Sequence, residues 1–175
     1  MKEKKSLSTA EFRKRASAIS LVLTDNDGVL TDAGVYYNEH GEAFKRFSIR
    51  DGMGVELLRQ AGIETAIMTS ELSPSVRRRA EKLRMRYLYL GIKDKKGYLP
   101  SLLKEIQLKP TQLAYIGDDV NDLEILEAIG KSGLIGSPAD AIPEVRKIVH
   151  YCSKARGGNG AFREFAEWIL RLRKK

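Results

Sequence analysis

The sequence predicts an α/β fold in which helices cover both faces of a parallel central sheet. Apolar strand-like segments alternate with helix-like segments along most of the 175 residues. The apolar segments, such as ISLVLT at residues 19–24, are continuous, which is typical of strands buried on both faces. One segment, at about residues 33–48, has alternating aromatic residues around a turn and predicts a protruding β-hairpin. The length suits one domain, which we expect to span residues 1–175.

Caps, turn residues and apolar periodicity define the expected elements in order. Ser8 or Thr9 can cap a first helix to about residue 18, Asp51 can cap the helix after the hairpin, and Gly62 can end that helix. The later elements are strands ETAIM (64–68), RYLYL (86–90), LAYIG (113–117), SGLIG (132–136) and KIVHYC (147–152), and helices SPSVRRRAEKL (73–83), KKGYLPSLLKEI (95–106), NDLEILEAI (121–129) and AFREFAEWILRL (161–172), with Phe162, Phe165, Trp168 and Ile169 on one face of the last.

Composition indicates a globular protein of a reducing compartment. Hydrophobic residues make up 42% and charged residues 31%, and no apolar run reaches the length of a membrane span. The charged first residues lack the apolar middle of a signal peptide. The single cysteine, Cys152, is expected to be a small buried apolar group. We therefore expect a cytoplasmic protein with no membrane partner.

The net charge of +8 raises the question of nucleic-acid binding. Basic residues are spread along the predicted helices, as in RKR at 13–15 and RRR at 77–79, and aromatic residues are not interleaved with them. The aromatic side chains on which bases stack in a binding site for single-stranded nucleic acid are therefore missing. We expect solvated helix faces and no nucleic-acid partner, with attraction of an anionic small molecule as the alternative.

Reactive side chains follow the predicted strands or open the helices after them. Asp25 and Asp27 follow the first strand, and Thr69 follows the second strand of the sheet. Lys95 begins a helix, and the run GDDVND at 117–122 follows the strand LAYIG. In an open parallel sheet, ligands bind beyond the carboxyl ends of the strands. We therefore expect the carboxylates, the hydroxyl and the ammonium group to converge on one edge of the sheet.

This set of residues suits Mg²⁺ together with a phosphate. Mg²⁺ prefers oxygen ligands, binds through one or two carboxylates plus a phosphate, and would relieve the repulsion between Asp25 and Asp118. A lysine and a hydroxyl can hold the other phosphate oxygens, while one carboxylate attacks phosphorus and a second moves a proton. Each residue alone has an ordinary explanation, because aspartates form turns and cap helices after strands. The combination predicts a phosphoryl-transfer site.

The same residues resemble the motifs of a known family. DNDGVLTD (25–32), Thr69, Lys95 and GDDVND (117–122) are similar to the four motifs of the haloacid dehalogenase superfamily of phosphohydrolases. The resemblance covers nearly everything from residue 21 to residue 168, and implies a three-layer Rossmann-like fold without a cap domain. The segments that resemble its capless branch, typified by 3-deoxy-D-manno-octulosonate 8-phosphate phosphatases, are FSIRDGMG (47–54), YLGIKDK (89–95) and RGGNGAFREF (156–165).

The resemblance implies a role for each matching residue. Asp25 would form an aspartyl-phosphate, and Asp27 would protonate the leaving alcohol and then activate water. Mg²⁺ would be held by Asp25, by the backbone carbonyl of Asp27 and by Asp118. The other residues implied are Thr69, Ser70 and Lys95 at the phosphoryl oxygens, with Asp119 and Asp122 in support.

The spacing of the motifs leaves no room for a lid domain, since the predicted elements fill the segments between them. Phosphoryl transfer needs water to be controlled. The family's solution is a homotetramer in which the hairpin and C-terminal segment of a neighbouring subunit cover the pocket. The resemblance thus implies a homo-oligomer, although the aromatic residues of the hairpin suit the core of the same chain equally well. These residues are Tyr36, Tyr37, Phe44 and Phe47.

One departure from the octulosonate pattern divides the substrate prediction. Octulosonate phosphatases usually continue the second motif as Thr-Gly-Arg, whereas this chain has Thr69-Ser70-Glu71. Glu71, with Lys82 on the next helix, resembles the branch acting on nonulosonate 9-phosphates, while Arg50-Asp51-Gly52 is the octulosonate pattern. A solvated pair near the pocket mouth is the alternative for Glu71 and Lys82. The common prediction is a small phosphorylated 2-keto-3-deoxy sugar acid, whose carboxylate Arg156 or Arg163 can contact.

Two other functions compete with a Mg²⁺-dependent phosphatase. A phosphoacceptor signalling domain has similar groups, but its accepting aspartate follows the third strand, where this chain has YLYLG. A non-catalytic oligomerisation module, as in relatives fused to sugar-nucleotide synthetases, has lost catalytic carboxylates that this chain keeps at Asp25, Asp27 and Asp118. We therefore expect phosphate release that requires Mg²⁺ and is lost in Asp25→Asn.

Overall fold

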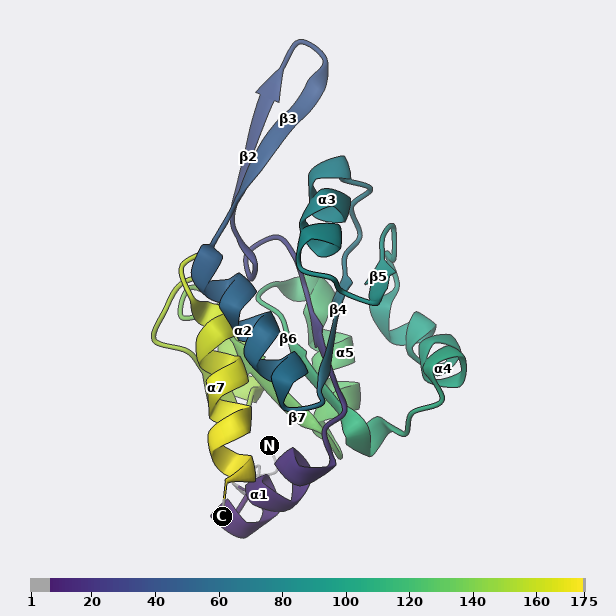
Figure 1. Ribbon diagram of the computed structural model, residues 1–175, viewed down its shortest axis with the longest axis vertical. Helices are drawn as coiled ribbons and strands as arrows, with labels where there is room; N and C mark the ends of the chain where they lie inside the picture. The colour runs from purple at the N-terminus through teal and green to yellow at the C-terminus, as the bar shows by residue number, and fades with distance from the viewer. Residues whose placement is uncertain (1–6, 175) are drawn as a thin grey trace.

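The computed structural model describes residues 7–174 and has three layers (Figure 1). Six strands form the central sheet: β1 (Leu21–Thr24), β4 (Glu64–Met68), β5 (Tyr87–Tyr89), β6 (Leu113–Ile116), β7 (Leu134–Ser137) and β8 (Tyr151–Cys152). Their order is β5-β4-β1-β6-β7-β8, and every neighbouring pair is parallel. The predicted parallel α/β fold is confirmed.

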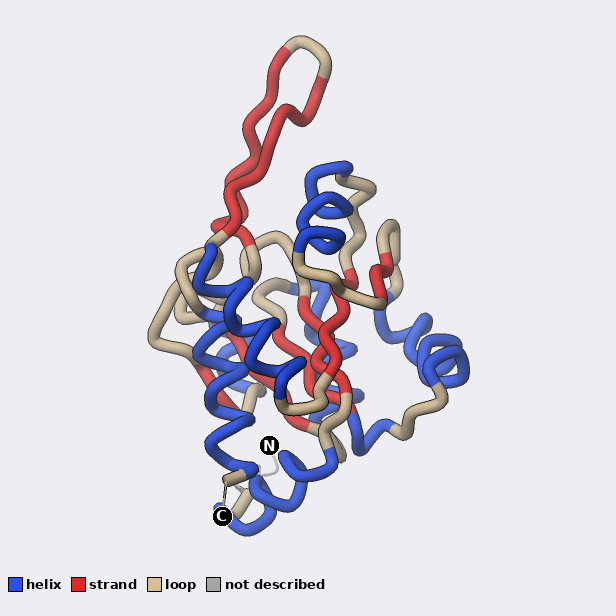
Figure 2. Tube along the Cα trace, in the orientation of Figure 1, coloured by secondary structure: helices blue, strands red, loops and turns tan. Residues whose placement is uncertain are grey.

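Helices cover both faces of this sheet (Figures 1 and 2). One face carries α1 (Thr9–Ala18), α2 (Ile49–Gln60), α3 (Pro74–Lys82) and α7 (Ala161–Arg173), and the other carries α4 (Lys95–Ile106), α5 (Leu123–Gly130) and α6 (Pro143–Ile148). Successive strand residues point to opposite faces, so Val22 packs in one core and Leu21 and Leu23 pack in the other. No helix between residues 7 and 174 combines the length and apolarity needed to cross a membrane.

The C-terminal helix α7 buries the face that its periodicity predicts. Phe162, Phe165 and Ile169 are fully buried, and Trp168 is partly buried, with its ring stacked on Tyr151. At the other end of the chain, the hydroxyl of Ser8 accepts a hydrogen bond from the third residue of α1. The amphipathic pattern and the cap are therefore sufficient to place both helices.

The hairpin consists of β2 (Thr31–Asn38) and β3 (Gly41–Phe47), which pair antiparallel and project from the body of the molecule (Figure 2). Tyr36 and Phe44 stack on one another and are each about half exposed. Tyr37 is 73% exposed. Phe47, at the base, instead packs against the core of the body. Three of the four hairpin aromatics are therefore outside the core of their own chain.

Three local predictions are wrong. The first residues of the predicted strand KIVHYC are instead the end of α6, a helix that begins with Pro143 in its first turn. Only Tyr151–Cys152 remain as the strand β8. Cys152 is exposed rather than buried, since β8 is an edge strand. Ser48, not Asp51, caps α2, and Asp51 lies buried inside its first turn.

The chain reverses its direction across the sheet between β1 and β6. From β1 it adds β4 and β5 on one side, and it then crosses to add β6, β7 and β8 on the other. In such a sheet the ligand crevice lies beyond the carboxyl ends of the two strands at the reversal. Here those ends are followed directly by Asp25 and by Gly117-Asp118.

Candidate active site

A pocket of about 380 Å³ opens at this reversal, between the ends of β1 and β6, the end of β4 and one side of the hairpin. It brings together Asp25, Asp27, Thr69, Ser70 and Asp118, as the sequence predicts. Lys95 and Asp122 lie behind it, almost completely buried. The strand ends thus place all these groups at one edge of the sheet.

The loop after β1 is a tight turn built around Asn26. The carbonyl oxygen of Asn26 accepts hydrogen bonds from the backbone N–H groups of residues 29, 30 and 31. Gly28 in this turn has φ +87°, and a Cβ there would overlap Oδ2 of Asp118. A glycine is needed at this position both for the backbone conformation and for the close approach of Asp118.

The carboxylate of Asp25 is held on one oxygen and free on the other. Oδ1 accepts hydrogen bonds from the backbone N–H of Asn26 (2.8 Å) and lies 3.0 Å from Nζ of Lys95. Oδ2 accepts no hydrogen bond from any residue between 7 and 174. The residue is only 4% exposed. The arrangement leaves one oriented oxygen available for reaction or for a metal.

Lys95 is bound by a buried network. Its Nζ donates to Oδ1 of Asp122 (2.7 Å) and to the hydroxyl of Tyr115 (3.2 Å), and Tyr115 donates to the same oxygen of Asp122 (2.6 Å). Burial opposes the charge of Lys95, but Asp25 and Asp122 raise its pKa above the ordinary value. Tyr115 was not expected here, because a tyrosine in an apolar strand gives no signal that distinguishes a core residue from a site residue.

The acidic cluster fits a divalent cation. Carboxylate oxygens of Asp25, Asp118 and Asp122 lie within 4.8 Å of one another. Both oxygens of Asp122 already accept hydrogen bonds, Oδ1 from Lys95 and Tyr115 and Oδ2 from backbone N–H groups. Oδ1 of Asp118, by contrast, is buried without a partner among the described residues. A buried acceptor without a donor suits a metal ion that Asp25 and Asp118 share.

The electrostatics of the metal-free cluster support this interpretation. Burial, followed by repulsion from Asp122, raises the pKa of Asp25 to about 7. Burial and the charges of Asp25 and Asp122 raise the pKa of Asp118 to about 8. Both shifts mean that the folded chain resists holding this much negative charge in one place. A divalent cation would remove the conflict.

Thr69 and Ser70 line the pocket at the end of β4. The backbone N–H of Glu71 donates to Oγ1 of Thr69 (3.2 Å), so the hydroxyl hydrogen of Thr69 is left to donate to a ligand. Asp119, also at the pocket, caps a single 3-10 turn (Val120–Asp122) by accepting from the N–H of Val120. Thr69, Ser70 and Asp119 therefore all face the space that a ligand would occupy.

Asp27 turns its side chain away from the acidic cluster. Its Oδ2 lies 2.6 Å from Nζ of Lys45, a buried lysine of the hairpin. Its Oδ1 accepts from the side chains of Asn26 (3.0 Å) and Thr31 (3.2 Å). Lys45 was not expected in the site, because an alternating hairpin pattern does not reveal which of its faces meets the body of the protein.

The expected specificity residues are separated. Glu71 lines the pocket and is exposed. Lys82 lies in a different hollow between α2 and α3, because α3 runs away from the site and its end is about 12 Å from its start at 1.5 Å per residue. Glu71 and Lys82 therefore do not form a pair at the pocket mouth.

The three arginines also lie outside the pocket of their own chain. Arg50 is exposed in the first turn of α2. Arg156 forms an ion pair with Asp140 (3.1 Å), and Arg163 pairs with Glu167 one turn along α7 (2.7 Å). Arg156 and Arg163 therefore have acidic partners outside the pocket, and Arg50 faces solvent. The spacing of the arginines in the sequence does not reveal these surroundings.

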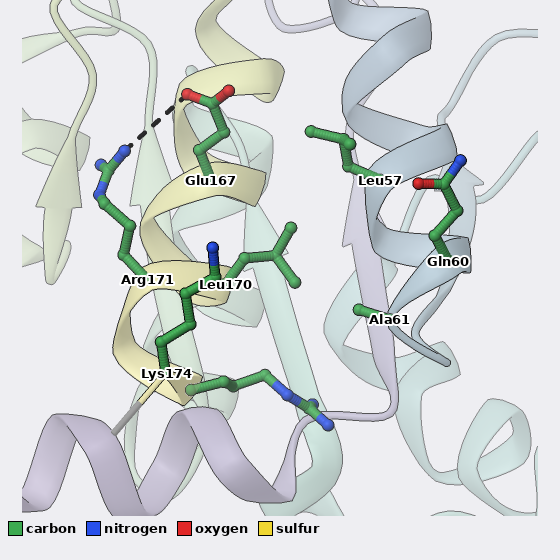
Figure 3. Close-up of a pocket in the computed structure, with 8 residues that line it drawn as sticks. Leu57, Gln60, Ala61, Glu167, Leu170, Arg171 and Lys174 are labelled. Atoms are coloured by element: carbon green, nitrogen blue, oxygen red, sulfur yellow. Dashed lines mark ion pairs between the residues drawn. The ribbon is translucent and has the colours of Figure 1, made fainter.

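A larger hollow, of about 610 Å³, lies between α2 and α7 (Figure 3). Its lining includes Leu57, Leu170 and several basic side chains. Two of the three basic groups are already engaged, since Arg171 pairs with Glu167 and Arg173 donates to backbone carbonyls of residues 16 and 19. Gln60 and Ala61, which line this hollow, lie at the end of α2, and Figure 1 shows that this end of the helix is opposite the carboxyl edge of the sheet. Although this hollow is larger than the pocket at the strand ends, it lies away from the edge where ligands bind, and we do not assign the reaction to it.

Comparisons with known proteins agree with this geometry. No protein-family model matches the chain. The chain is 38% identical over 164 residues to the 3-deoxy-D-manno-octulosonate 8-phosphate phosphatase KdsC of Haemophilus influenzae, and the match covers 94% of this chain and 89% of that relative.

Two solved structures extend the likeness to three dimensions. The 3-deoxy-D-manno-octulosonate 8-phosphate phosphatase of Moraxella catarrhalis, in complex with magnesium ion, phosphate ion and KDO, has a TM-score of 0.87 at 35% identity, covering 94% of this chain and 93% of that one. A protein of Legionella pneumophila assigned to HAD superfamily subfamily III A has a TM-score of 0.86 at 36% identity, covering 95% and 90%.

Proposed function

The chain belongs to the 3-deoxy-D-manno-octulosonate 8-phosphate phosphatase family within the haloacid dehalogenase superfamily, and from this premise we propose its reaction. The reaction is hydrolysis of the terminal phosphate monoester of a 2-keto-3-deoxy sugar acid, with 3-deoxy-D-manno-octulosonate 8-phosphate as the first candidate. The observation that carries the proposal is the meeting of Asp25, Lys95 and Asp118 where the sheet reverses.

Asp25, Asp118 and the backbone carbonyl of Asp27 would hold Mg²⁺. The unpartnered Oδ1 of Asp118 and the raised pKa values of Asp25 and Asp118 support this ligand set. Bound there, Mg²⁺ supplies positive charge that offsets the carboxylates and the developing charge on the phosphoryl oxygens. Asp122 is left to orient Lys95, since its oxygens are already occupied.

The reaction has two steps in this proposal. In the first, an oxygen of Asp25 bonds to phosphorus while the ester P–O bond breaks, and Asp27 gives its proton to the leaving sugar oxygen. In the second, water attacks the phosphorus of the aspartyl-phosphate, Asp27 takes a proton from that water, and the Asp25 carboxylate is released with inorganic phosphate. Thr69 and Lys95 donate hydrogen bonds to the phosphoryl oxygens in both steps.

Asp25→Asn tests the nucleophile. We expect the rate of phosphate release from octulosonate 8-phosphate with Mg²⁺ to fall by at least about a thousandfold. The melting temperature should not fall, because the change removes one charge from a repulsive cluster. Asp32→Asn is the matched control, since Asp32 follows the same loop at the start of β2 but pairs with Arg46. Turnover retained in a clean Asp25→Asn preparation contradicts the assignment.

A nonulosonate 9-phosphate is the second candidate substrate. It is favoured by Glu71, a carboxylate in the pocket where octulosonate phosphatases usually have arginine. We expect Glu71→Arg to change the ratio of kcat/KM for the eight-carbon and nine-carbon substrates by about tenfold or more. Glu144→Arg makes the same charge change on an exposed position of α6 and should leave the ratio alone. An unchanged ratio in Glu71→Arg removes Glu71 from substrate selection.

We also propose a homo-oligomer, with a tetramer as the expected state, in which the hairpin at residues 33–48 covers the pocket of a neighbouring copy. Support comes from the exposed aromatic side chains of the projecting hairpin and from the open mouth of the pocket beside it. Water has to be controlled during phosphoryl transfer, and residues 7–174 of one chain form no lid domain over the pocket. The exposed Arg156 on the C-terminal loop would then be available to a neighbour's substrate.

A further inference from the structure

Lys45, in the hairpin strand β3, is buried beside the candidate active site. Only 2% of its side chain is exposed, and its Nζ lies 2.6 Å from Oδ2 of Asp27 and 3.6 Å from Oε2 of Glu42. A lysine is almost never fully buried unless it is paired. The hairpin therefore brings a positive charge into the site of its own chain, in addition to its exposed aromatic residues.

The carboxylate of Asp27 is held from two sides. Asn26 of the same loop and Thr31, the first residue of β2, donate to Oδ1, and Lys45 of β3 donates to Oδ2. A group that transfers protons must be kept in a defined orientation within hydrogen-bond reach of the reacting atoms. The orientation of Asp27 thus depends on the hairpin as well as on its own loop.

Glu42 keeps Lys45 in this place. Its Oε1 accepts hydrogen bonds from the hydroxyls of Ser73 and Ser75 at the start of α3. Its other oxygen faces Lys45. The lysine consequently lies between a carboxylate that ties the hairpin to α3 and the carboxylate of Asp27. Its position is determined by three separate segments of the chain.

We propose that Lys45 is a positioning residue for the phosphatase reaction, which holds Asp27 in the orientation that both proton transfers require. This inference rests on the proposed function. The proton still passes from Asp27 to the leaving oxygen in the first step, and from water to Asp27 in the second, while Lys45 keeps its own protons. The two lysines of the site contact different carboxylates. Lys45 contacts Asp27, whereas the ammonium group of Lys95 contacts Asp25 and Asp122.

The test compares two substrates in Lys45→Met. The sugar acid phosphate has an alkoxide leaving group that needs a proton, whereas para-nitrophenyl phosphate releases a nitrophenolate that does not. The ratio kcat/KM reports the steps through the first irreversible one, which here is the breaking of the ester bond. We expect kcat/KM for the sugar phosphate to fall on the order of a hundredfold, and that for the aryl phosphate to change by less than about threefold.

Arg46→Met is the matched control, because it removes the neighbouring cation from the same strand, where Arg46 pairs with Asp32 and not with Asp27. Its selectivity between the two substrates should match that of the wild type. Equal losses on both substrates in Lys45→Met, or a change confined to KM, would overturn the proposal. Wild-type activity on the sugar phosphate is a separate measurement, so a wrong substrate is distinguished from a wrong role for Lys45.

Two further variants distinguish an effect of Lys45 on Asp27 from a folding defect. Lys45→Gln retains a hydrogen-bond donor, and Lys45→Met combined with Asp27→Asn shows whether the lysine acts through Asp27. If it does, the lysine change costs less than about threefold on the sugar phosphate once Asp27 has been replaced. A full loss in both backgrounds identifies Lys45 as a structural residue only.

Discussion

Gly28 shows how much a single residue can decide in this site. Its positive φ lets the loop after β1 turn sharply, and the missing side chain leaves room for Oδ2 of Asp118. The C-terminal loop also packs here, since Gly157 lies directly against the carbonyl of Gly28. Three segments that are far apart in the sequence therefore meet at one glycine.

Gly28→Ala should both destabilise the fold and weaken Mg²⁺ binding. The backbone strain costs about 1 kcal/mol in the free energy of unfolding, and the displaced Asp118 should raise the Kd for Mg²⁺ by at least about tenfold. Gly62→Ala is the control, because Gly62 also has a positive φ but nothing within 4 Å of the added Cβ. Urea unfolding and calorimetric Mg²⁺ titration measure the two effects. Equal Kd values in the two variants contradict the assignment of Asp118.

At the scale of elements, α2 and α7 are joined by Asp51. The first turn of a helix leaves backbone N–H groups without partners, and the N-cap residue of α7, Gly160, has no side chain to supply. Asp51, in the first turn of α2, accepts instead from the N–H groups of Gly160 (3.1 Å) and Arg163 (3.0 Å). One buried carboxylate from a distant helix thus caps the C-terminal helix.

Asp51→Ala is expected to lower the free energy of unfolding by about 3 kcal/mol, because two buried N–H groups lose their acceptor. Ser48→Ala removes only the cap of α2 and should cost about 1 kcal/mol. Chemical denaturation of both variants measures the difference. If Asp51→Ala costs no more than Ser48→Ala, the carboxylate does not hold the two helices together.

At the scale of the whole molecule, metal binding and stability should be linked through pH. Without metal, Asp25 and Asp118 have pKa values of about 7 and about 8, well above those of unfolded aspartates. The folded chain then binds more protons than the unfolded chain between about pH 4 and pH 8, so its stability falls as the pH rises through that range. Mg²⁺ binds the deprotonated carboxylates and opposes this loss.

We expect Mg²⁺, at about a hundred times the Kd it has at pH 8, to raise the melting temperature by about 5–10 °C at pH 8, and the same Mg²⁺ concentration to raise it clearly less at pH 6. Asp118→Asn should abolish the Mg²⁺ effect, and should make the metal-free protein less sensitive to rising pH. Thermal unfolding with Mg²⁺ and with a chelator at both pH values provides the measurement. An equal Mg²⁺ effect at pH 6 and pH 8 is the contrary result.

The projecting hairpin is the other feature of the whole molecule that needs a test. Tyr37→Ser combined with Phe44→Ser removes its two most exposed aromatic side chains. We expect the mass by light scattering to fall from a multiple of 19.6 kDa towards that of one chain. Leu72→Ser, at an equally exposed apolar residue outside the hairpin, should leave the mass unchanged. A wild-type chain that is monomeric contradicts the proposed assembly.

Local sequence features predict the order of the elements correctly almost throughout. Apolar runs, caps and glycines are short-range signals, and they place β1, the hairpin, α4 and α7 within a few residues. The errors fall where a local signal competes with a stronger one. Pro143 starts a helix that takes the first two residues of the predicted strand KIVHYC, and Ser48 takes the capping position from Asp51.

The sequence by itself determined which reactive side chains meet at the pocket, because Asp25, Asp27, Thr69 and Asp118 follow buried parallel strands and such strands end at one edge. Only the tertiary structure decided which partners surround these groups. Lys45 contacts Asp27 because of the orientation of the hairpin relative to the body of the protein. Lys82 lies away from the pocket because of the direction of α3. Such contacts depend on the rotation and register of whole elements, which no local pattern of residues records.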